Sequence, residues 1–96
     1  MLAHNDEDAT RLVRDLAERG VRVPGDLALV TYDDEVAALA EIPLTAVAPP
    51  KRAVGRAAVE LLTERLAEGG GGEREPRRHV ELLPALRVRG SCGAVA

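Results

Sequence analysis

The sequence contains almost no aromatic side chains. Among its 96 residues there is no Phe and no Trp, and Tyr32 is the one Tyr. A core must therefore be built from Ala, Val, Leu and Ile, which bury less apolar area per residue than aromatic side chains do. A chain of this length allows one small domain at most, and small domains bury a small fraction of their surface. We therefore expect marginal stability, or dependence on a partner surface.

Cysteine and basic clusters are equally scarce. Cys92 is the one Cys, which excludes an intrachain disulfide and with it the disulfide-rich secreted domains. The 13 basic and 16 acidic residues give a net charge of −3 and are interspersed, which argues against a nucleic-acid-binding face. Arg77-Arg78, beside His79, is the one locally basic spot, and we interpret it as a solvated loop.

Long hydrophobic runs are absent as well. Met1–Ala3 leads directly into polar residues, so the start of the chain has no signal-peptide core. No apolar stretch approaches the length of a membrane span. These absences favour a cytoplasmic protein without a membrane partner.

Strand-like and helix-like patterns alternate along the chain. Residues 27–32 (LALVTY) form a short, nearly continuous apolar run, which is typical of a parallel strand buried on both faces. From Asp6 the apolar residues follow helical spacing on one face, and Gly20 is a suitable left-handed end for that helix. Further strands are expected at residues 2–3, 44–48, 79–84 and 86–90, and further helical segments at 35–40 and 50–68.

This order predicts an α/β fold with a partial doubly wound, mostly parallel sheet. A parallel sheet needs helices on both faces, and two long helices are about half of a normal doubly wound domain. The chain also starts in the middle of a strand, so we expect a piece of a larger domain. Gly69–Gly72 cannot hold a helix, and residues 68–79 are expected to form a flexible surface loop.

Polar residues follow two of the expected strands. Asn5-Asp6 follows the first, and Asp33-Asp34 follows residues 27–32. Ligands of open parallel sheets bind beyond the carboxyl ends of the strands, so both pairs would face one crevice. An Asn amide donates and accepts hydrogen bonds and a carboxylate accepts two, which suits a polyhydroxylated ligand such as a sugar. The alternative is that Asn5 and Asp34 merely cap the helices that follow them.

No catalytic or metal-binding set accompanies these carboxylates. A phosphoryl-transfer pocket would need a further Asp and a Lys at other strand ends, and the single Lys51 follows a strand without an Asp. Ser91 and Cys92 lie near an end of the chain that we expect to be frayed, and no motif places His4 or His79 beside them. We therefore expect no enzyme activity, no metal and no cofactor.

An ordered series of motifs carries a resemblance to a known family. The motifs are "ND" at residues 5–6, "GVRVPGD" at 20–26, "YDD" at 32–34, "PLT" at 43–45, "GRAAVELL" at 55–62 and "LRVRGS" at 86–91. In this order the sequence resembles the C-terminal part of the lactose-repressor/galactose-repressor (LacI/GalR) family of bacterial transcription regulators. The resemblance covers residues 2–92. No element is specific alone, and the series together is.

The resemblance implies an effector domain of the type I periplasmic-binding-protein-like fold, with a small ligand between two α/β lobes. It places Asn5 and Asp33 in the ligand pocket, the same positions that the strand ends single out. Asp6, Tyr32 and Asp34 would support the site or cap helices, with Asp34 expected to cap the short helix after it. The family usually has Gly where Thr31 stands here.

The resemblance also implies a role in transcription. Residues 1–96 would be the C-terminal portion of the effector domain, with the 55–62 helix in the first lobe and the closing strands in the second. The effector would be a sugar or related metabolite and the protein a homodimer. DNA would be bound through an N-terminal helix-turn-helix domain that this chain lacks. The alternatives are a solute-binding protein of the same fold, with a transport or chemoreceptor role, and an inert, self-associating piece.

Overall fold

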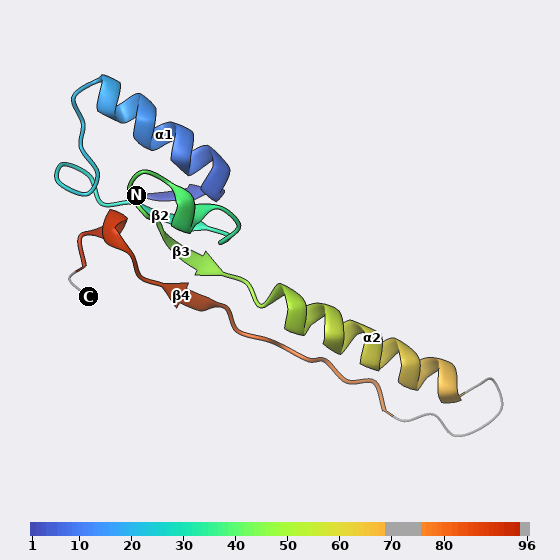
Figure 1. Cartoon of the computed structure of the whole chain (residues 1–96). Helices are drawn as coiled ribbons and strands as arrows, with labels where there is room; N and C mark the ends of the chain where they lie inside the picture. The colour runs from blue at the N-terminus through green and yellow to red at the C-terminus, as the bar shows by residue number, and fades with distance from the viewer. Residues whose placement is uncertain (69–75, 95–96) are drawn as a thin grey trace. The chain divides into compact units, whose positions relative to one another are not determined.

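The structure is a computed structural model, and it describes residues 1–68 and 76–94 (Figure 1). The chain divides into two compact units. Unit 1 consists of Met1–Pro49 together with Pro84–Ala96, and unit 2 is the intervening Pro50–Leu83. Unit 1 holds all of the predicted site residues, and each unit is described by itself.

A four-stranded sheet forms the centre of unit 1, with strand order β1-β2-β3-β4. The first three strands run parallel and β4 runs antiparallel to β3, so the mostly parallel α/β fold is confirmed. The strand predicted at 86–90 appears as the shorter β4, and residues 79–84 form no strand, contrary to prediction. The elements of unit 1 are β1 (Leu2–His4), α1 (Asp6–Glu18), β2 (Val30–Tyr32), the 3-10 helix η1 (Ala37–Leu39), β3 (Thr45–Ala48), β4 (Ala85–Arg87) and the 3-10 helix η2 (Gly90–Cys92).

Helix α1 has both of the ends that its sequence predicts. Asn5 precedes it in an extended conformation, and its side-chain oxygen accepts a hydrogen bond from the Asp8 N–H at 3.2 Å. Three acidic residues occupy the first turn, where the helix dipole favours negative charge. Gly20 follows the helix with a φ of 80°, a conformation that costs glycine little. Helix α1 therefore begins at a fixed point, with one residue between it and the end of β1.

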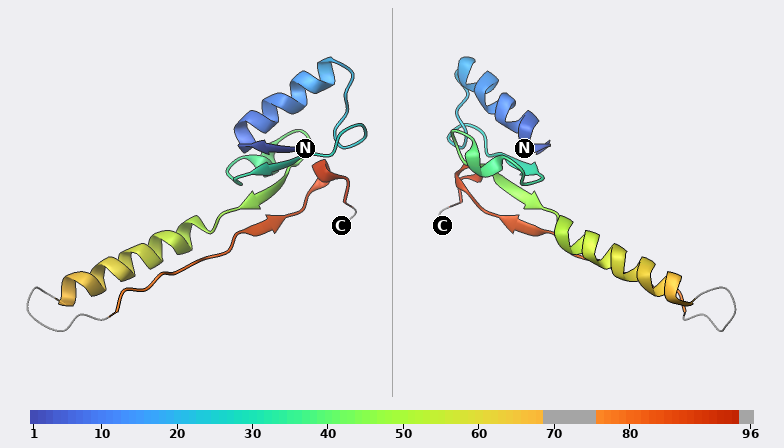
Figure 2. Two further views of the ribbon diagram at one scale, coloured as in Figure 1. Left: turned by 180° about the vertical axis from the view of Figure 1, so that it is seen from behind. Right: turned by 45° about the vertical axis from the view of Figure 1, so that its right-hand side comes forward.

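The core of unit 1 lies between α1 and the sheet, and α1 packs against β1 and β2 (Figures 1 and 2). Leu29 and Leu44 are its largest fully buried apolar side chains. No aromatic ring takes part, as the composition requires. Among the residues that the structure describes, the buried apolar ones are Ala9, Val13, Val23, Leu29, Ala37, Leu44 and Ala46. This cluster fixes the positions of the strand ends that carry the candidate site.

Unit 2 contains one helix, α2 (Lys51–Glu68), where a helix was predicted at 50–68. None of its residues is buried, although its sequence contains several Val and Leu side chains. On one side, Val54 and Leu61 line a shallow groove together with Val80 and Leu82 from the segment after the helix. Most of the predicted flexible loop, residues 69–75, lies outside the described residues.

Candidate functional site

The strand register brings Asn5 and Asp33 to neighbouring positions. His4 of β1 pairs with Tyr32 of β2 in the parallel ladder, and Asn5 and Asp33 are the residues that follow this pair. Tyr32 in turn pairs with Val47 of β3, so three parallel strands end at the same edge of the sheet. Open parallel sheets bind their ligands at this edge. The two residues expected to bind ligand therefore start from adjacent strand ends.

Asp33 has an unusual backbone conformation. Its φ is 77°, which places it in the left-handed region that non-glycine residues rarely occupy. Asp and Asn are the residues that tolerate this region best. Its N–H donates to the Val47 carbonyl at 2.9 Å, so the turn away from the sheet begins immediately after this residue. Its side chain is half-buried.

Asn5 uses part of its side chain to cap α1. The Oδ1 atom accepts from the Asp8 N–H, which is the capping role given above as the alternative to ligand binding. The amide nitrogen makes no hydrogen bond to the described part of the chain. An amide group held at Oδ1 keeps two donors on its nitrogen, so capping and ligand binding are compatible.

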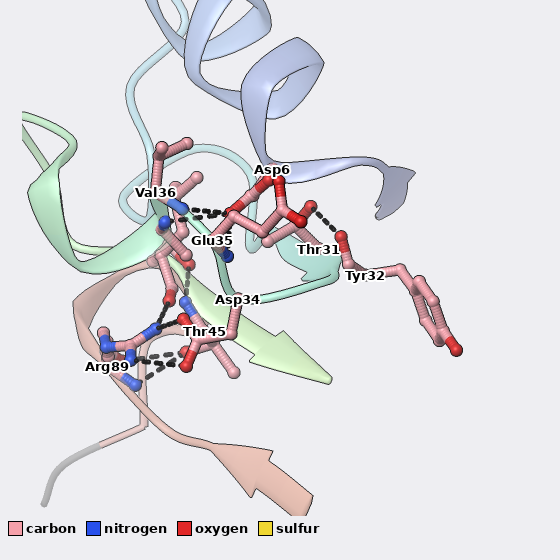
Figure 3. A network of polar contacts seen from close by, with 11 residues as sticks. Asp6, Thr31, Tyr32, Asp34, Glu35, Val36, Thr45 and Arg89 are labelled. Atoms are coloured by element: carbon pink, nitrogen blue, oxygen red, sulfur yellow. Dashed lines mark hydrogen bonds and ion pairs between the residues drawn. The ribbon is translucent and has the colours of Figure 1, made fainter. Parts of the chain in front are cut away.

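The carboxylate of Asp6 is the buried polar centre beside the site (Figure 3). The residue is 1% exposed, and its Oδ2 accepts three backbone N–H bonds, from Glu35 at 2.7 Å, Val36 at 2.6 Å and Ala37 at 3.0 Å. These are the N–H groups at the start of η1, which have no partner inside a helix. Asp6 therefore caps η1 from the first residue of α1 and holds residues 35–37 against the start of that helix.

Asp34 does not cap the helix that follows it, contrary to expectation. That helix, η1, begins after Val36 and has no side-chain cap from its own neighbours. Asp34 instead accepts two hydrogen bonds from the Arg89 guanidinium, at 2.8 and 3.1 Å (Figure 3). These bonds hold the pKa of Asp34 below its ordinary value of 3.8, against burial, which raises it; the charges of Arg89 and Arg87 lower it further.

Tyr32 and His4 form a stacked pair beside the strand ends. Their ring centroids lie 5.5 Å apart with an interplanar angle of 24°. Tyr32 points away from the network around Asp6 and is 38% exposed (Figure 3). Thr31, on the opposite face of β2, is fully buried and donates its hydroxyl to the Ala3 carbonyl at 2.9 Å. Tyr32 therefore borders the site, and the hydroxyl of Thr31 joins β2 to β1.

The other residues weighed for chemistry lie in structural roles. Ser91 is fully buried; its hydroxyl donates to the Leu29 carbonyl at 2.6 Å and accepts from the Thr45 N–H at 2.8 Å. These bonds hold Ser91 in place within η2, near an end of the chain that was expected to be frayed; residues 95–96 lie outside the described residues. The Thr45 hydroxyl, whose single proton is shared with the Arg89 carbonyl, lies 3.1 Å from the Cys92 Sγ, and this contact lowers the pKa of the thiol. Within residues 1–68 and 76–94, no group of three acidic, His or Cys side chains is placed to hold a metal ion.

Arg89 is the residue that sequence reasoning missed. In a strand at 86–90, Leu86 and Val88 would lie on one face and Arg87 and Arg89 on the other. The structure ends β4 at Arg87, and the Arg89 side chain turns inward to 21% exposure. Its partner Asp34 is 55 residues away along the chain, so no local signal joins the two.

Comparison with known proteins agrees with this geometry. Residues 1–92 match the model of the periplasmic binding protein-like domain family. The chain is 37% identical over 86 residues to the HTH-type transcriptional repressor PurR of Vibrio atlanticus, which covers 88% of this chain and 26% of that protein. The chain belongs to the LacI/GalR family.

Solved structures of LacI-type regulators show the same fold. The regulator CelR, solved as a cellobiose complex, superposes with a TM-score of 0.76 at 37% identity, over 94% of this chain and 27% of that one. A LacI family regulator from Lactobacillus casei, solved with bound sucrose, gives a TM-score of 0.74 at 32% identity, over 94% and 32% of the two chains. The chain thus spans about a quarter of the length of the curated relatives it matches. No helix in the described residues is long and apolar enough to cross a membrane.

Proposed function

We propose that this chain forms one side of the effector site of a LacI-type transcription regulator, and that Asn5 and Asp33 bind hydroxyl groups of a sugar or related polyol. One observation carries the proposal: these two residues directly follow the His4–Tyr32 pair of adjacent parallel strands. Neighbouring strands are about 5 Å apart. That spacing suits groups that bind neighbouring hydroxyls of one small molecule.

The chemistry of the two side chains supports a polyhydroxylated ligand. The Asn5 amide nitrogen donates, and an ionised Asp33 carboxylate accepts, so together they serve both ends of a hydroxyl group. Hydrogen bonds to a charged acceptor are about twice as strong as those between neutral groups. The relatives described above were solved with cellobiose and sucrose, and another structure of the Lactobacillus casei regulator holds Tris, which also carries several hydroxyls.

Effector binding would act on DNA through other parts of the regulator. A ligand that binds one arrangement of the two lobes better than the other shifts the balance between them by its differential affinity. We assign α2 of unit 2 to the first lobe and the sheet of unit 1 to the second, because the chain separates into two units at these residues. The protein would act in the cytoplasm, as a dimer, without catalysing a reaction.

The test is effector response in the regulator that contains this chain. Asp33→Asn removes the negative charge and keeps a side chain that tolerates the left-handed backbone. Operator binding is followed by fluorescence anisotropy while glucose, sucrose or cellobiose is added. We expect the variant to bind the operator normally and to need at least about tenfold more sugar for release, since a hydrogen bond to a charged group contributes about 1.5–3 kcal/mol.

Asp15→Asn is the matched control, because Asp15 is an exposed acidic residue on α1. It loses the same charge and should respond like the unaltered protein. A normal response of Asp33→Asn would show that Asp33 does not bind the effector. Absence of a response of the unaltered protein to every sugar would remove sugars as the ligand class.

A further inference from the structure

The Arg89 guanidinium makes three hydrogen bonds, two of them to the carboxylate of Asp34. Its guanidinium donates to both carboxylate oxygens of Asp34 and, through Nη1, to the Leu44 carbonyl at 2.8 Å. The Arg89 and Asp34 side chains are 21% and 20% exposed. Two parallel bonds between a planar guanidinium and a carboxylate fix orientation as well as distance. This ion pair is therefore partly shielded from water and fixed in geometry.

The backbone that carries Arg89 is itself held firmly. Its N–H donates to the Thr45 hydroxyl at 2.9 Å, and its carbonyl accepts from the same hydroxyl at 3.0 Å. Two residues further on, the fully buried Ser91 bonds to the residue before β2 and to the first residue of β3. The guanidinium thus extends from a segment that is tied to the sheet on both sides.

Asp34 belongs to the loop that follows β2, and this loop begins with Asp33, the proposed ligand-binding residue. Asp33 lies between the last residue of β2 and Asp34, while residues 35–37 are bound by Asp6. Asp33 has a φ of 77°. Without constraints from its surroundings, a non-glycine residue adopts this left-handed conformation about one tenth as often as the right-handed one. Such a conformation persists when the surrounding structure imposes it. Asp34 is the neighbour through which that constraint reaches Asp33 from the C-terminal side.

We propose that Arg89 is a positioning residue for the effector site: by holding Asp34, it keeps Asp33 in the left-handed conformation from which Asp33 binds ligand. The ligand-binding half of this statement rests on the proposed function above. The conformational half does not, since it concerns the chain without ligand. In this role Arg89 acts through Asp34 and not through the effector.

The role requires the shape of arginine as well as its charge. The ammonium of Lys is a point charge that cannot make two parallel bonds to Asp34 while a third group reaches Leu44. Lys at position 89 should therefore hold Asp33 less well than Arg does, and Gln should hold it least. A role limited to net charge would leave Lys as good as Arg.

The experiment follows the backbone of Asp33 by NMR in the isotopically labelled 96-residue chain. The one-bond Cα–Hα coupling distinguishes positive from negative φ. We expect Arg89→Gln to move the Asp33 coupling toward the value of negative φ, with Arg89→Lys intermediate. Asp34→Asn, which keeps a side chain of the same size, should reproduce the effect if Arg89→Gln fails to fold. Arg78→Gln is the control, because Arg78 also pairs with one carboxylate: its Nη2 donates to both carboxylate oxygens of Glu64 in unit 2, and both side chains are 56% exposed.

The two halves of the proposal fail separately. An unchanged Asp33 coupling in folded Arg89→Gln and Asp34→Asn, or Arg78→Gln behaving like Arg89→Gln, would overturn the positioning role. In the regulator, Arg89→Gln should raise the glucose, sucrose or cellobiose concentration for operator release about tenfold, matching the lost population of the competent conformation. If Arg89→Gln changes the Asp33 coupling but the unaltered regulator does not respond to any of the sugars, the positioning role is retained and the proposed function is rejected.

Discussion

Replacing Asp6 with Ala removes the acceptor shared by three backbone N–H groups. The Oδ2 atom lies 2.7 Å from the Glu35 nitrogen, 2.6 Å from that of Val36 and 3.0 Å from that of Ala37. The bond to Ala37 is buried, and the other two are partly buried. In the variant the first two N–H groups can turn to water, whereas the third is left without a partner.

The expected cost is about 3 kcal/mol of unfolding free energy. A buried donor without a partner, here the Ala37 N–H, costs about 1–3 kcal/mol, and the two partly buried N–H groups lose less because water can bond to them. Loss of a negative charge from the first turn of α1 adds about 0.3–1 kcal/mol. Small domains are stable by about 5–15 kcal/mol in total, so the variant should lose a large share of its stability.

Urea denaturation followed by far-UV circular dichroism measures this loss, and amide hydrogen exchange at Ala37 localises it. Asp8→Ala is the matched control, because Asp8 is an exposed acid in the same first turn and its N–H still bonds to Asn5. The control should lose the charge–dipole part alone. Equal stability of the two variants would refute the assignment of Asp6 as the cap of η1.

Three further outcomes are expected. Arg89 lowers the pKa of Asp34 in the folded chain, so the stability that the ionised Asp34 contributes is complete above its ordinary pKa of 3.8 and is lost as the pH falls through the lower pKa of the folded state. Urea titrations across this pH range should show the loss of stability, and Asp34→Asn should abolish this pH dependence. Leu29→Ala empties a fully buried site and should cost about 2–5 kcal/mol by thermal or urea unfolding, whereas Leu39→Ala, at 83% exposure, should stay within about 0.5 kcal/mol. The 96-residue chain should self-associate through α2, where Leu62 and Leu66 are 60% and 72% exposed, and Leu62→Glu should shift light scattering toward the monomer; a well-folded monomer before substitution would contradict this.

Much of unit 1 follows from local pattern in the sequence. The apolar run at residues 27–32 marks the place of β2, but the strand spans Val30–Tyr32 and its burial alternates, with Tyr32 exposed, so the predicted burial on both faces is wrong. The polarity changes abruptly at Asp33 because the chain leaves the sheet there. The same change of polarity at both strand ends marks Asn5 and Asp33 in the sequence, and the parallel register makes them neighbours in the fold. Helix α1 is equally predictable, since its cap, first-turn acids and terminal glycine are all local features.

The bonds that hold the site are not local, and the sequence does not reveal them. The cap of η1 is expected at Asp34, just before that helix, and is supplied by Asp6, 30 residues before Val36. Arg89 alternates with apolar residues as a solvent-facing strand residue would, although β4 has ended before it. In both cases the local pattern is compatible with two environments, and the partner that decides between them is chosen by the fold.

Unit 1 is assembled from two stretches of chain, and the last strand of the first stretch, β3, pairs with the first strand of the second stretch, β4. Ala48 of β3 pairs with Ala85 of β4. The residues between them therefore occupy the place of the loop in an antiparallel hairpin, and a two-residue turn such as Asn-Gly is enough to close such a loop. Engineering can exploit this: residues 49–84 become a replaceable cassette, and a reporter domain with adjacent termini can be grafted at the same junction without cutting any strand.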